Sequence, residues 1–380
     1  MQYPISRLAF GLAVVSSLAF SSGAAAQDAR LFRSERHDFQ VVTVVSGLEH
    51  PWGMAFLPGG DILVTERPGR LRLISGGVLD PEPIAGTPEV WANGQGGLLD
   101  VALHPEFEEN QLIYLSYAKP GPSGATTAVA RGKLEGKRLT GLEEVFEAQA
   151  WGRRGQHFGS RLVFDGKGYL FISLGDRGEM HEAQNLSNHK GTIIRIHDDG
   201  RIPEDNPFVG VEGALPEIWA YGIRNAQGLA LHPMTGELWE TEHGPRGGDE
   251  INLILPGRNY GWPVITYGIN YNGEPISDLT EKEGMEQPLH YWVPSIATSG
   301  LAIYDAAAFP GWRGDAFVGG LAGTQLARVT FDGHRSVSEE TLLKELRQRI
   351  RDVRVGPDGF IYLLVDAKDA PVLRIEPVAN

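Results

Sequence analysis

The sequence has no cysteine among its 380 residues. Disulfide bonds are therefore excluded, and stability must come from the packed core or from a bound metal. Basic residues are also fewer than acidic ones. The sequence has 34 Lys and Arg against 48 Asp and Glu, which gives a net charge of −14. Nucleic acid and anionic membranes are poor partners for such a chain, and a neutral or cationic small substrate fits better. The acids could also supply cation ligands, although solubility is the alternative explanation.

Long apolar runs are nearly absent. The exception is Leu8–Phe20, which follows Arg7, precedes three alanines at 24–26, and is too short to span a bilayer comfortably. This pattern is typical of a secretory signal, so we predict a signal peptide at 1–26 and export to a bacterial periplasm. No later run is long and apolar enough for a membrane span. We predict that residues 27–380 form a single domain.

Helical periodicity is rare, whereas 49 glycines and 24 prolines indicate many turns. One phrase recurs: an apolar strand, a Pro/Asp/Gly turn, a second apolar strand, then an acidic or glycine-rich exit. Its six copies begin at Trp52, Leu98, Leu162, Gly228, Gly300 and Val353. Six such units, none able to bury both faces alone, predict an all-β, six-bladed β-propeller. The strand at 40–45 is expected to complete the last blade. A large β-sandwich is the alternative fold, but its strands would not repeat one turn phrase.

In a propeller the ends of the inner strands converge on one mouth of the central channel, so the loops there are the natural site. We expect five remote segments to meet at that mouth: 94–97, the His157 loop, 222–225, 243–245 and 349–352.

The densest chemistry lies between Gly155 and Gly178. His157 precedes the strand 162–164, an Asp-Gly turn follows, and a second strand ends just before Asp176. A hairpin returns its far end to its start, so His157 and Asp176 should lie close together. A histidine with a carboxylate in reach can act as a general base, because the carboxylate fixes the tautomer and stabilises the imidazolium. The alternative is a loop histidine and an unrelated turn aspartate.

Arg224 and Asn225 place a cation and an amide just before a blade strand. Arg224 could fork to a carboxylate or polarise a carbonyl, or it could form a salt bridge at a blade boundary. Arg349 and Arg351 lie on one face of an extended segment, which suits a ligand with several carboxylates; solvated arginines are the alternative.

The segment 242–253 combines glycines with acids. Its glycines allow carbonyls to turn inward, and Asp249 and Glu250 are candidate carboxylate ligands, which together suit Ca²⁺. A glycine-rich surface loop with solvated acids is the alternative. Trp262 and Trp292 lie in rigid aromatic and proline segments that suit contact with a sugar or a planar cofactor, or simply blade packing.

Taken as a set, several motifs resemble the soluble quinoprotein glucose/sorbosone dehydrogenase family. The likeness is greatest to bacterial periplasmic aldose sugar dehydrogenases that use pyrroloquinoline quinone (PQQ). It extends over nearly all of the chain after residue 50. The motifs are GQGGLL at 94–99, HFGSRL at 157–162, GDRG at 175–178, YGIRN at 221–225, HGP at 243–245, DEIN at 249–252, NYGWP at 259–263 and IRDV at 350–353.

The resemblance implies a six-bladed propeller that oxidises aldose sugars at the anomeric carbon to lactones. His157 matches the base that takes the proton from the anomeric hydroxyl as hydride passes to PQQ, and Asp176 matches the carboxylate behind it. Arg224 matches the arginine over the reactive quinone carbonyl. The other positions that match PQQ-holding residues are Gln95, Asn225, Arg349 and Arg351. Two Ca²⁺ sites are implied, one at the carbonyls of Gly244 and Pro245 beside PQQ, and a structural one at Glu250 and the Tyr260 carbonyl.

The sequence departs from the family at Ala322, where some members have a lysine that meets the cofactor. Shorter loops than in glucose-specialised enzymes suggest an open, broadly specific sugar site, with an unnamed periplasmic electron acceptor. Two other functions are considered. A Ca²⁺-dependent propeller lactonase would need carboxylates and Asn around a metal in the channel, where this sequence puts Arg and His. A non-catalytic propeller would bind sugar without turnover.

Overall fold

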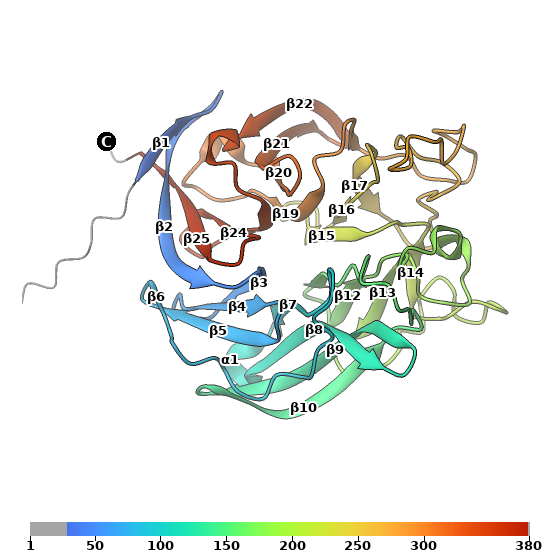
Figure 1. Cartoon of the computed structure of the whole chain (residues 1–380), viewed down its shortest axis with the longest axis horizontal. Coiled ribbons are helices and arrows are strands. Elements are labelled where there is room, and N and C mark those ends of the chain that lie inside the picture. The colour runs from blue at the N-terminus through green and yellow to red at the C-terminus, as the bar shows by residue number, and fades with distance from the viewer. Residues whose placement is uncertain (1–28, 379–380) are drawn as a thin grey trace, which may run out of the picture.

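A computed structural model describes residues 29–378, in which six β-sheets are arranged in a ring around a central axis (Figure 1). The predicted all-β six-bladed propeller is confirmed, and the β-sandwich alternative is wrong. The predicted signal peptide at 1–26 lies outside the described residues. Within them, no helix is both long and apolar enough to cross a membrane.

Each blade is an antiparallel sheet whose first strand lies nearest the axis. Blade 1 consists of β3 (Pro51–Phe56), β4 (Ile62–Glu66), β5 (Arg70–Ser75) and β6 (Val78–Leu79). Blade 2 consists of β7 (Leu98–Leu103), β8 (Leu112–Gly121), β9 (Gly124–Glu135) and β10 (Arg138–Glu147). Blade 3 consists of β11 (Leu162–Phe164), β12 (Tyr169–Ser173), β13 (Thr192–His197) and β14 (Ile218–Tyr221).

The second half of the chain repeats this plan. Blade 4 consists of β15 (Ala226–Leu231), β16 (Leu238–Glu242), β17 (Asp249–Ile254) and β18 (His290–Trp292). Blade 5 consists of β19 (Thr298–Ile303), β20 (Ala316–Gly320), β21 (Gln325–Asp332) and β22 (Arg335–Leu342). Blade 6 consists of β23 (Ile350–Val355), β24 (Ile361–Val365), β25 (Ala370–Pro377), β2 (Asp38–Leu48) and β1 (Arg30–Arg33). Four short helical segments connect strands: α1 (Phe107–Asn110), η1 (Met180–Gln184), η2 (Pro310–Trp312) and η3 (Lys344–Leu346).

Blade 6 closes the ring as predicted, because the N-terminal strand β2 pairs antiparallel with the C-terminal strand β25. Each inner strand also packs on the inner strands of both neighbouring blades, through the six pairs β3–β7, β7–β11, β11–β15, β15–β19, β19–β23 and β23–β3. The ring therefore depends on contacts between residues that are remote in sequence.

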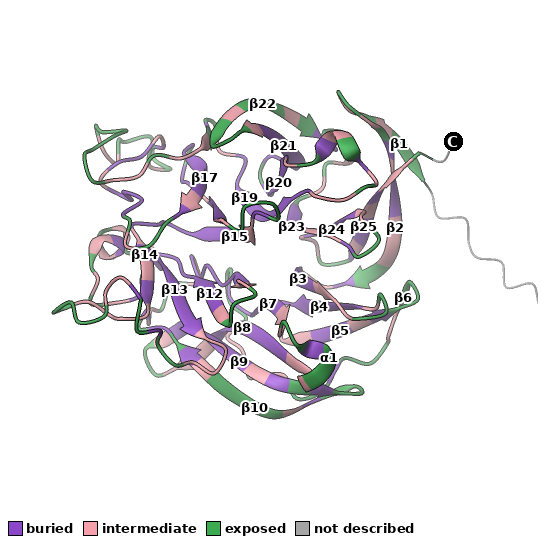
Figure 2. Cartoon of the chain, turned by 180° about the vertical axis from the view of Figure 1, so that it is seen from behind, coloured by how far each residue is buried: buried purple, intermediate pink, exposed green. Residues whose placement is uncertain are grey.

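The core lies between neighbouring blades. Every residue of the second strands β4, β16, β20 and β24 is buried, because both faces of each strand meet an adjacent sheet (Figure 2). Exposure rises toward the outermost strands, as in the pattern of β22. A rigid ring of this kind holds its inner loops at fixed positions around the axis.

Candidate active site

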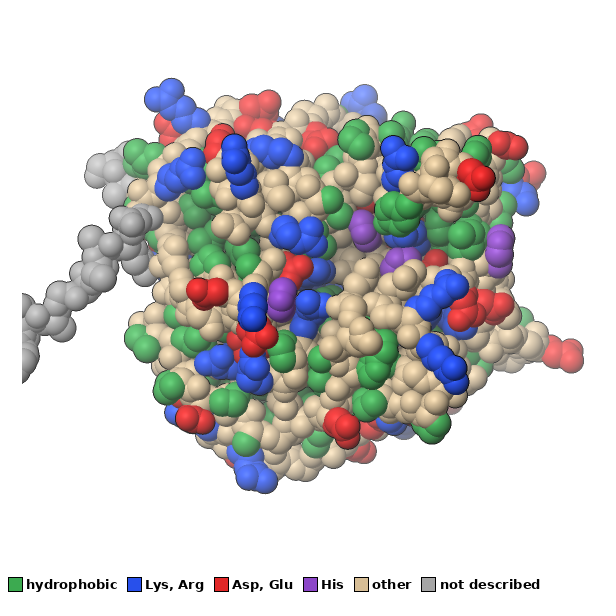
Figure 3. All heavy atoms as spheres, in the orientation of Figure 1, with side chains coloured by type: hydrophobic (Ala, Val, Ile, Leu, Met, Phe, Trp, Pro, Cys, Tyr) green, Lys and Arg blue, Asp and Glu red, His purple; other side chains and the backbone are tan. Residues whose placement is uncertain are grey.

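All six blades contribute to a cavity of about 280 Å³ at one end of the axis. Its lining comes from the first residues of inner strands, from the segments that precede them and from residues that follow second strands. These reach the same end because the strands are antiparallel. The lining residues are Trp52, Arg67, Gly94, Gln95, Leu99, Phe158, Gly159, Asn225, Gln227, His243, Ala297, Leu321, Arg349, Arg351 and Asp366. The five loop segments predicted to meet therefore lie at one mouth. Figure 3 shows basic and histidine side chains gathered around the middle of one face.

A second cavity of about 570 Å³ adjoins the first, since His243, Ala297 and Arg349 line both. Ala322, the position at which the sequence departs from the family pattern, lines this second cavity. The two cavities therefore form one continuous hollow at the mouth.

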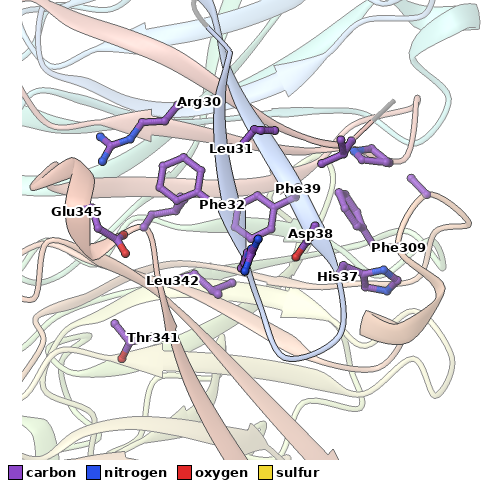
Figure 4. Close-up of a pocket in the computed structure, with 15 residues that line it drawn as sticks. Arg30, Leu31, Phe32, His37, Asp38, Phe39, Phe309, Thr341, Leu342 and Glu345 are labelled. Carbon is purple, nitrogen blue, oxygen red and sulfur yellow. The ribbon is translucent and has the colours of Figure 1, made fainter. Parts of the chain in front are cut away.

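A larger cavity of about 840 Å³ lies elsewhere, between β1 and the end of β22 (Figure 4). Its lining mixes the rings of Phe32, Phe39 and Phe309 with Arg30 and Glu345, and it shares no residue with the cavity at the mouth. Cavity size alone therefore does not indicate the chemical site; the convergent polar groups do.

His157 and Asp176 are brought together by the hairpin of β11 and β12. The Nδ1 atom of His157 lies 2.6 Å from Oδ1 of Asp176, and the two residues are 7% and 1% exposed. His157 adopts a left-handed backbone conformation with φ of 54°, which only a minority of non-glycine residues adopt. A side chain on Gly175 would place its Cβ 2.3 Å from the His157 carbonyl oxygen, so glycine is required for this close approach.

The surroundings lower the pKa values of both His157 and Asp176, which favours a neutral imidazole beside a charged carboxylate. Burial lowers the pKa of His157 below its usual value, Arg224 lowers it further, and the hydrogen bond to Asp176 opposes both. Burial alone would raise the pKa of Asp176, but His157 and Arg224 outweigh it and the net shift is downward. Asp176 is thus an anion that accepts the Nδ1 proton of a neutral imidazole, which leaves Nε2 with its lone pair.

Arg224 lies beside this pair. Its backbone carbonyl accepts the N–H of Asp176 at 2.8 Å, and its side chain is buried. Nη1 donates to the carbonyls of His243 at 2.5 Å and Gly244 at 3.1 Å, and the guanidinium lies 5.4 Å from the ring centre of Trp262. The alternative of a boundary salt bridge does not hold, since the guanidinium of Arg224 donates to carbonyls and only its backbone N–H donates to a carboxylate, that of Glu242. The Gly244 carbonyl, expected to be free for Ca²⁺, is engaged by Arg224 in this structure.

Part of the cavity wall carries arginines around one carboxylate, Asp366. Arg349 and Arg351 approach Asp366 to 3.6 and 3.5 Å. Burial would raise the pKa of Asp366, but Arg351, His50 and Arg67 outweigh it and lower the pKa to about 2. Burial lowers the pKa of Arg351 to about 10, and the buried Nε atoms of Arg67 and Arg351 have no hydrogen-bond partner within residues 29–378. Positive charge therefore exceeds negative charge on this wall.

Gln95 and Asn225 hold the histidine loop in place. Gln95 Oε1 accepts the backbone N–H of His157 at 2.8 Å, and Asn225 Oδ1 accepts that of Gly159 at 3.2 Å. Both residues also line the cavity.

The predicted metal ligands divide into two kinds. Asp249 is buried and accepts hydrogen bonds from Gly244, Ser295 and Thr298, so its oxygens are already used. Glu250 lies on β17 opposite Glu242 of β16, and the side-chain amide of Asn252 donates at 3.2 Å to both Glu250 and Glu240.

Burial raises the pKa of Glu250 to about 7 and raises the pKa values of Glu240 and Glu242 as well. Across residues 29–378, no group of three His, Asp or Glu side chains meets the geometry of a metal site.

The structure adds three polar cavity residues that the sequence alone did not reveal: Arg67, Gln227 and Asp366. Gln227 Oε1 accepts from Arg351 at 2.9 Å. Arg67 and Asp366 each directly follow the second strand of a blade, and that shared position is the signal that could have revealed them.

The profile of the Glucose / Sorbosone dehydrogenase family matches residues 48–374. The chain belongs to this family. It is 46% identical over 336 residues to aldose sugar dehydrogenase YliI of Escherichia coli K12, covering 87% of this chain and 91% of that one. It is 26% identical to quinoprotein glucose dehydrogenase B of Acinetobacter calcoaceticus, covering 88% and 87%. As a glucose/sorbosone dehydrogenase family member, it is an oxidoreductase.

Solved structures agree with this assignment. The apo-form crystal structure of the soluble aldose sugar dehydrogenase from Escherichia coli superposes with a TM-score of 0.87 at 44% identity, covering 89% of this chain and 99% of that one. The PQQ-bound form of the aldose sugar dehydrogenase from Streptomyces coelicolor superposes with a TM-score of 0.73 at 26% identity, covering 92% and 97%.

Proposed function

We propose that this family member oxidises aldose sugars at the anomeric carbon to lactones, with PQQ as its cofactor. The observation that carries the proposal is the buried pair of His157 and Asp176, 2.6 Å apart. Neither residue itself lines the arginine-lined cavity, but Phe158 and Gly159, which directly follow His157, do. The names of its relatives support the same substrate and cofactor, since one is an aldose sugar dehydrogenase and another was solved in a PQQ-bound form.

The cavity fits a flat polycarboxylate such as PQQ. Arg349 and Arg351 both line it, and the Nε of buried Arg351, which has no partner among residues 29–378, marks hydrogen-bonding capacity that this part of the chain does not use. The residues that would hold PQQ are Gln95, Arg224, Asn225, Arg349 and Arg351, and Arg67 extends the set. When bound, PQQ supplies an acceptor for the hydride that leaves the anomeric carbon.

In this proposal His157 is the general base. Nε2 takes the proton of the anomeric hydroxyl, while Nδ1–H remains bonded to Asp176 and the carboxylate stabilises the resulting imidazolium. Arg224 places a fixed positive charge on the same side, where it stabilises negative charge that develops in the transition state. His157 is only 7% exposed, so water has little access to its proton.

Calcium fits the glutamate cluster of β16 and β17, and we infer a structural Ca²⁺ at Glu250 and the Tyr260 carbonyl. Glu240 Oε1 and Asn252 Oδ1 are buried beside Glu250 without a hydrogen-bond partner in the described part of the chain, which is costly unless a cation neutralises the cluster. For the Ca²⁺ beside PQQ, the Gly244 and Pro245 carbonyls are hard oxygen donors at the mouth. For Ca²⁺ to bind the Gly244 carbonyl, Arg224 would have to break its hydrogen bond to that oxygen or share the oxygen with the ion.

Reconstitution tests the proposal directly. Apoprotein is mixed with PQQ and Ca²⁺, an aldose panel is added, and reduction of an artificial electron-accepting dye is followed together with the absorption spectrum. We expect dye reduction that requires PQQ and sugar, and a lactone product. Lactone hydrolysis without dye reduction would support the lactonase alternative, and sugar binding without turnover would support a binding propeller.

Calcium removal gives a separate expected outcome. Ca²⁺ at about 100 times its dissociation constant should add about 2.7 kcal/mol of stability, and so raise the melting temperature by several degrees relative to EDTA. Calorimetry with and without EDTA measures this difference. In Glu250→Gln the part of the difference that comes from this structural site should vanish. The EDTA-treated variant should be at least as stable as the EDTA-treated parent, because the buried cluster of Glu240, Glu242 and Glu250 loses one carboxyl group. An unchanged response in Glu250→Gln would contradict the site.

The titration of His157 is predicted from its surroundings. In cofactor-free protein its pKa should lie below 6.5, because burial and Arg224 outweigh Asp176. The unfolded chain then binds more protons than the folded chain between the two pKa values, so stability falls as pH drops below 6.5 through the folded pKa. NMR of ¹⁵N-histidine-labelled protein, assigned with a His157 variant, measures the midpoint. In Arg224→Gln the midpoint should rise, and a parent value at or above 7 would contradict this electrostatic account.

Export and the electron acceptor stay predictions. Fractionation of the host should recover the protein in the periplasm without residues 1–26, and recovery in the cytoplasm with an intact N-terminus would contradict the predicted signal peptide.

A further inference from the structure

Trp262 contacts two charged groups of the candidate active site, Asp176 and Arg224. Its indole Nε1–H donates to Asp176 Oδ2 at 2.8 Å, and the residue is 4% exposed. The same ring lies 5.4 Å from the Arg224 guanidinium. One side chain therefore touches both the carboxylate behind the histidine and the neighbouring cation.

The backbone of Trp262 is anchored on two sides. Its N–H donates to the Gly222 carbonyl at 2.8 Å, and its carbonyl accepts from Gln184 Nε2, also at 2.8 Å. These bonds attach the long segment between β17 and β18 to the loops of blade 3. The indole is thus a fixed donor, since both the ring and its backbone are packed in place.

The hydrogen bonds of Asp176 show what the indole contributes. Oδ1 accepts from His157 Nδ1 at 2.6 Å and from the Gly178 N–H at 2.7 Å, whereas Oδ2 accepts from Trp262. Both bonds at Oδ1 lie on one side of the carboxylate. Without a donor at Oδ2, that buried, charged oxygen would lack a hydrogen bond. The Asp176 carboxylate would then be free to rotate about its Cβ–Cγ bond toward another donor.

We propose that Trp262 is a positioning residue, whose indole N–H fixes the Asp176 carboxylate so that Oδ1 faces Nδ1 of His157 and Nε2 is left to take the substrate proton. The proposal rests on the proposed function for its catalytic meaning, but the hydrogen-bond geometry can be tested without turnover.

The charged groups that face His157 are Asp176, Arg224 and His243. Asp176 is the one of the three that favours the protonated imidazole, while Arg224 and His243 oppose it. If the carboxylate turns away, His157 loses that support, its pKa falls further, and the imidazolium of the transition state is less stable.

The kinetic test compares Trp262→Phe with Trp292→Phe in PQQ- and Ca²⁺-loaded protein. Phenylalanine keeps a ring but removes the donor. Trp292 is the matched control because it packs in the hydrophobic core beside blade 5 and lines neither cavity at the mouth. It is 5% exposed, and its indole N–H also donates to a carboxylate, Glu339, at 2.9 Å.

For Trp262→Phe we expect kcat to fall by roughly 10- to 100-fold, the cost of losing a hydrogen bond to a buried charge. KM for the sugar should change less than about twofold, and the acid limb of the kcat pH profile should move to lower pH. Trp292→Phe should keep the parent kcat and profile. A parent-like kcat in Trp262→Phe would overturn the proposal, and an acid limb moved to higher pH would show that the indole only withdraws charge from Asp176.

The second readout uses cofactor-free protein, so it separates this proposal from the proposed function. In ¹⁵N-histidine-labelled parent and Trp292→Phe protein, the Nδ1 proton of His157 should resonate far downfield, as in a short hydrogen bond to a carboxylate. In Trp262→Phe the signal should move upfield or exchange away. An unchanged signal in Trp262→Phe overturns the positioning role, even if the loaded enzyme proves active, and a changed signal supports it even if PQQ does not reconstitute activity.

Discussion

Replacing His157 by asparagine should lower kcat by roughly 10²- to 10⁴-fold, because general-base catalysis typically contributes that much. Asparagine is the better choice than alanine here, since it tolerates the left-handed backbone at this position, where φ is 54°. PQQ affinity should be retained, because the arginines of the cavity are untouched. The measurement is steady-state dye reduction at saturating PQQ and Ca²⁺, with PQQ binding followed by fluorescence titration.

His189→Asn is the matched control for this experiment. His189 is fully buried in blade 3, and its Nε2 lies 3.0 Å from a Glu217 oxygen, so it is also a buried histidine paired with a carboxylate. Neither His189 nor its neighbours in the sequence line the cavity at the mouth, whereas Phe158 and Gly159 next to His157 do. The control should lose stability but keep kcat, and a kcat of His157→Asn within tenfold of the parent would contradict the role of His157 as the base.

The fold could be predicted from the sequence because the repeat is local. Each copy carries its own strand, turn and strand, and the strands β3, β7, β11, β15, β19 and β23 form where the six copies begin. The closure of blade 6 by β2 was also predictable, since six copies leave one N-terminal strand without a sheet. Each blade of a propeller repeats one local sequence pattern, so the number of copies of the pattern predicts the number of blades.

The site was predictable only in part. His157 and Asp176 are joined by one hairpin, so short-range geometry sufficed. The pairing of Arg351 with Asp366 and Gln227 joins blades 6 and 4, and no local pattern encodes it. Such partners are set by ring closure, which brings together loops that the sequence keeps far apart.

The bond between Trp262 and Asp176 was missed for a related reason. The motif at 259–263 indicated a rigid aromatic segment, but a tryptophan that contacts a ligand and one that holds a catalytic carboxylate look the same in sequence. Likewise, the sequence could place the carbonyl of Gly244 at the mouth without showing that Arg224 donates to it.

The double variant Arg349→Ala/Arg351→Ala should weaken PQQ binding by roughly 10²- to 10⁴-fold, the expected cost of losing two charge-assisted hydrogen bonds. The catalytic pair is untouched, so kcat extrapolated to saturating PQQ should stay within about threefold of the parent. Fluorescence titration gives the dissociation constant, and PQQ-dependent kinetics give the extrapolated kcat.

Loss of stability must be separated from loss of binding, because both arginines also neutralise Asp366. Adding Asp366→Asn to the double variant removes the carboxylate that would be left without its arginines, and this triple variant should recover melting temperature without recovering PQQ affinity. Arg328→Ala is the opposite control, since Arg328 is buried in blade 5 with Asp315 and Glu340 and should affect stability alone. A PQQ dissociation constant that responds equally in Arg328→Ala and the triple variant would show that the wall of arginines acts on folding and does not bind the cofactor.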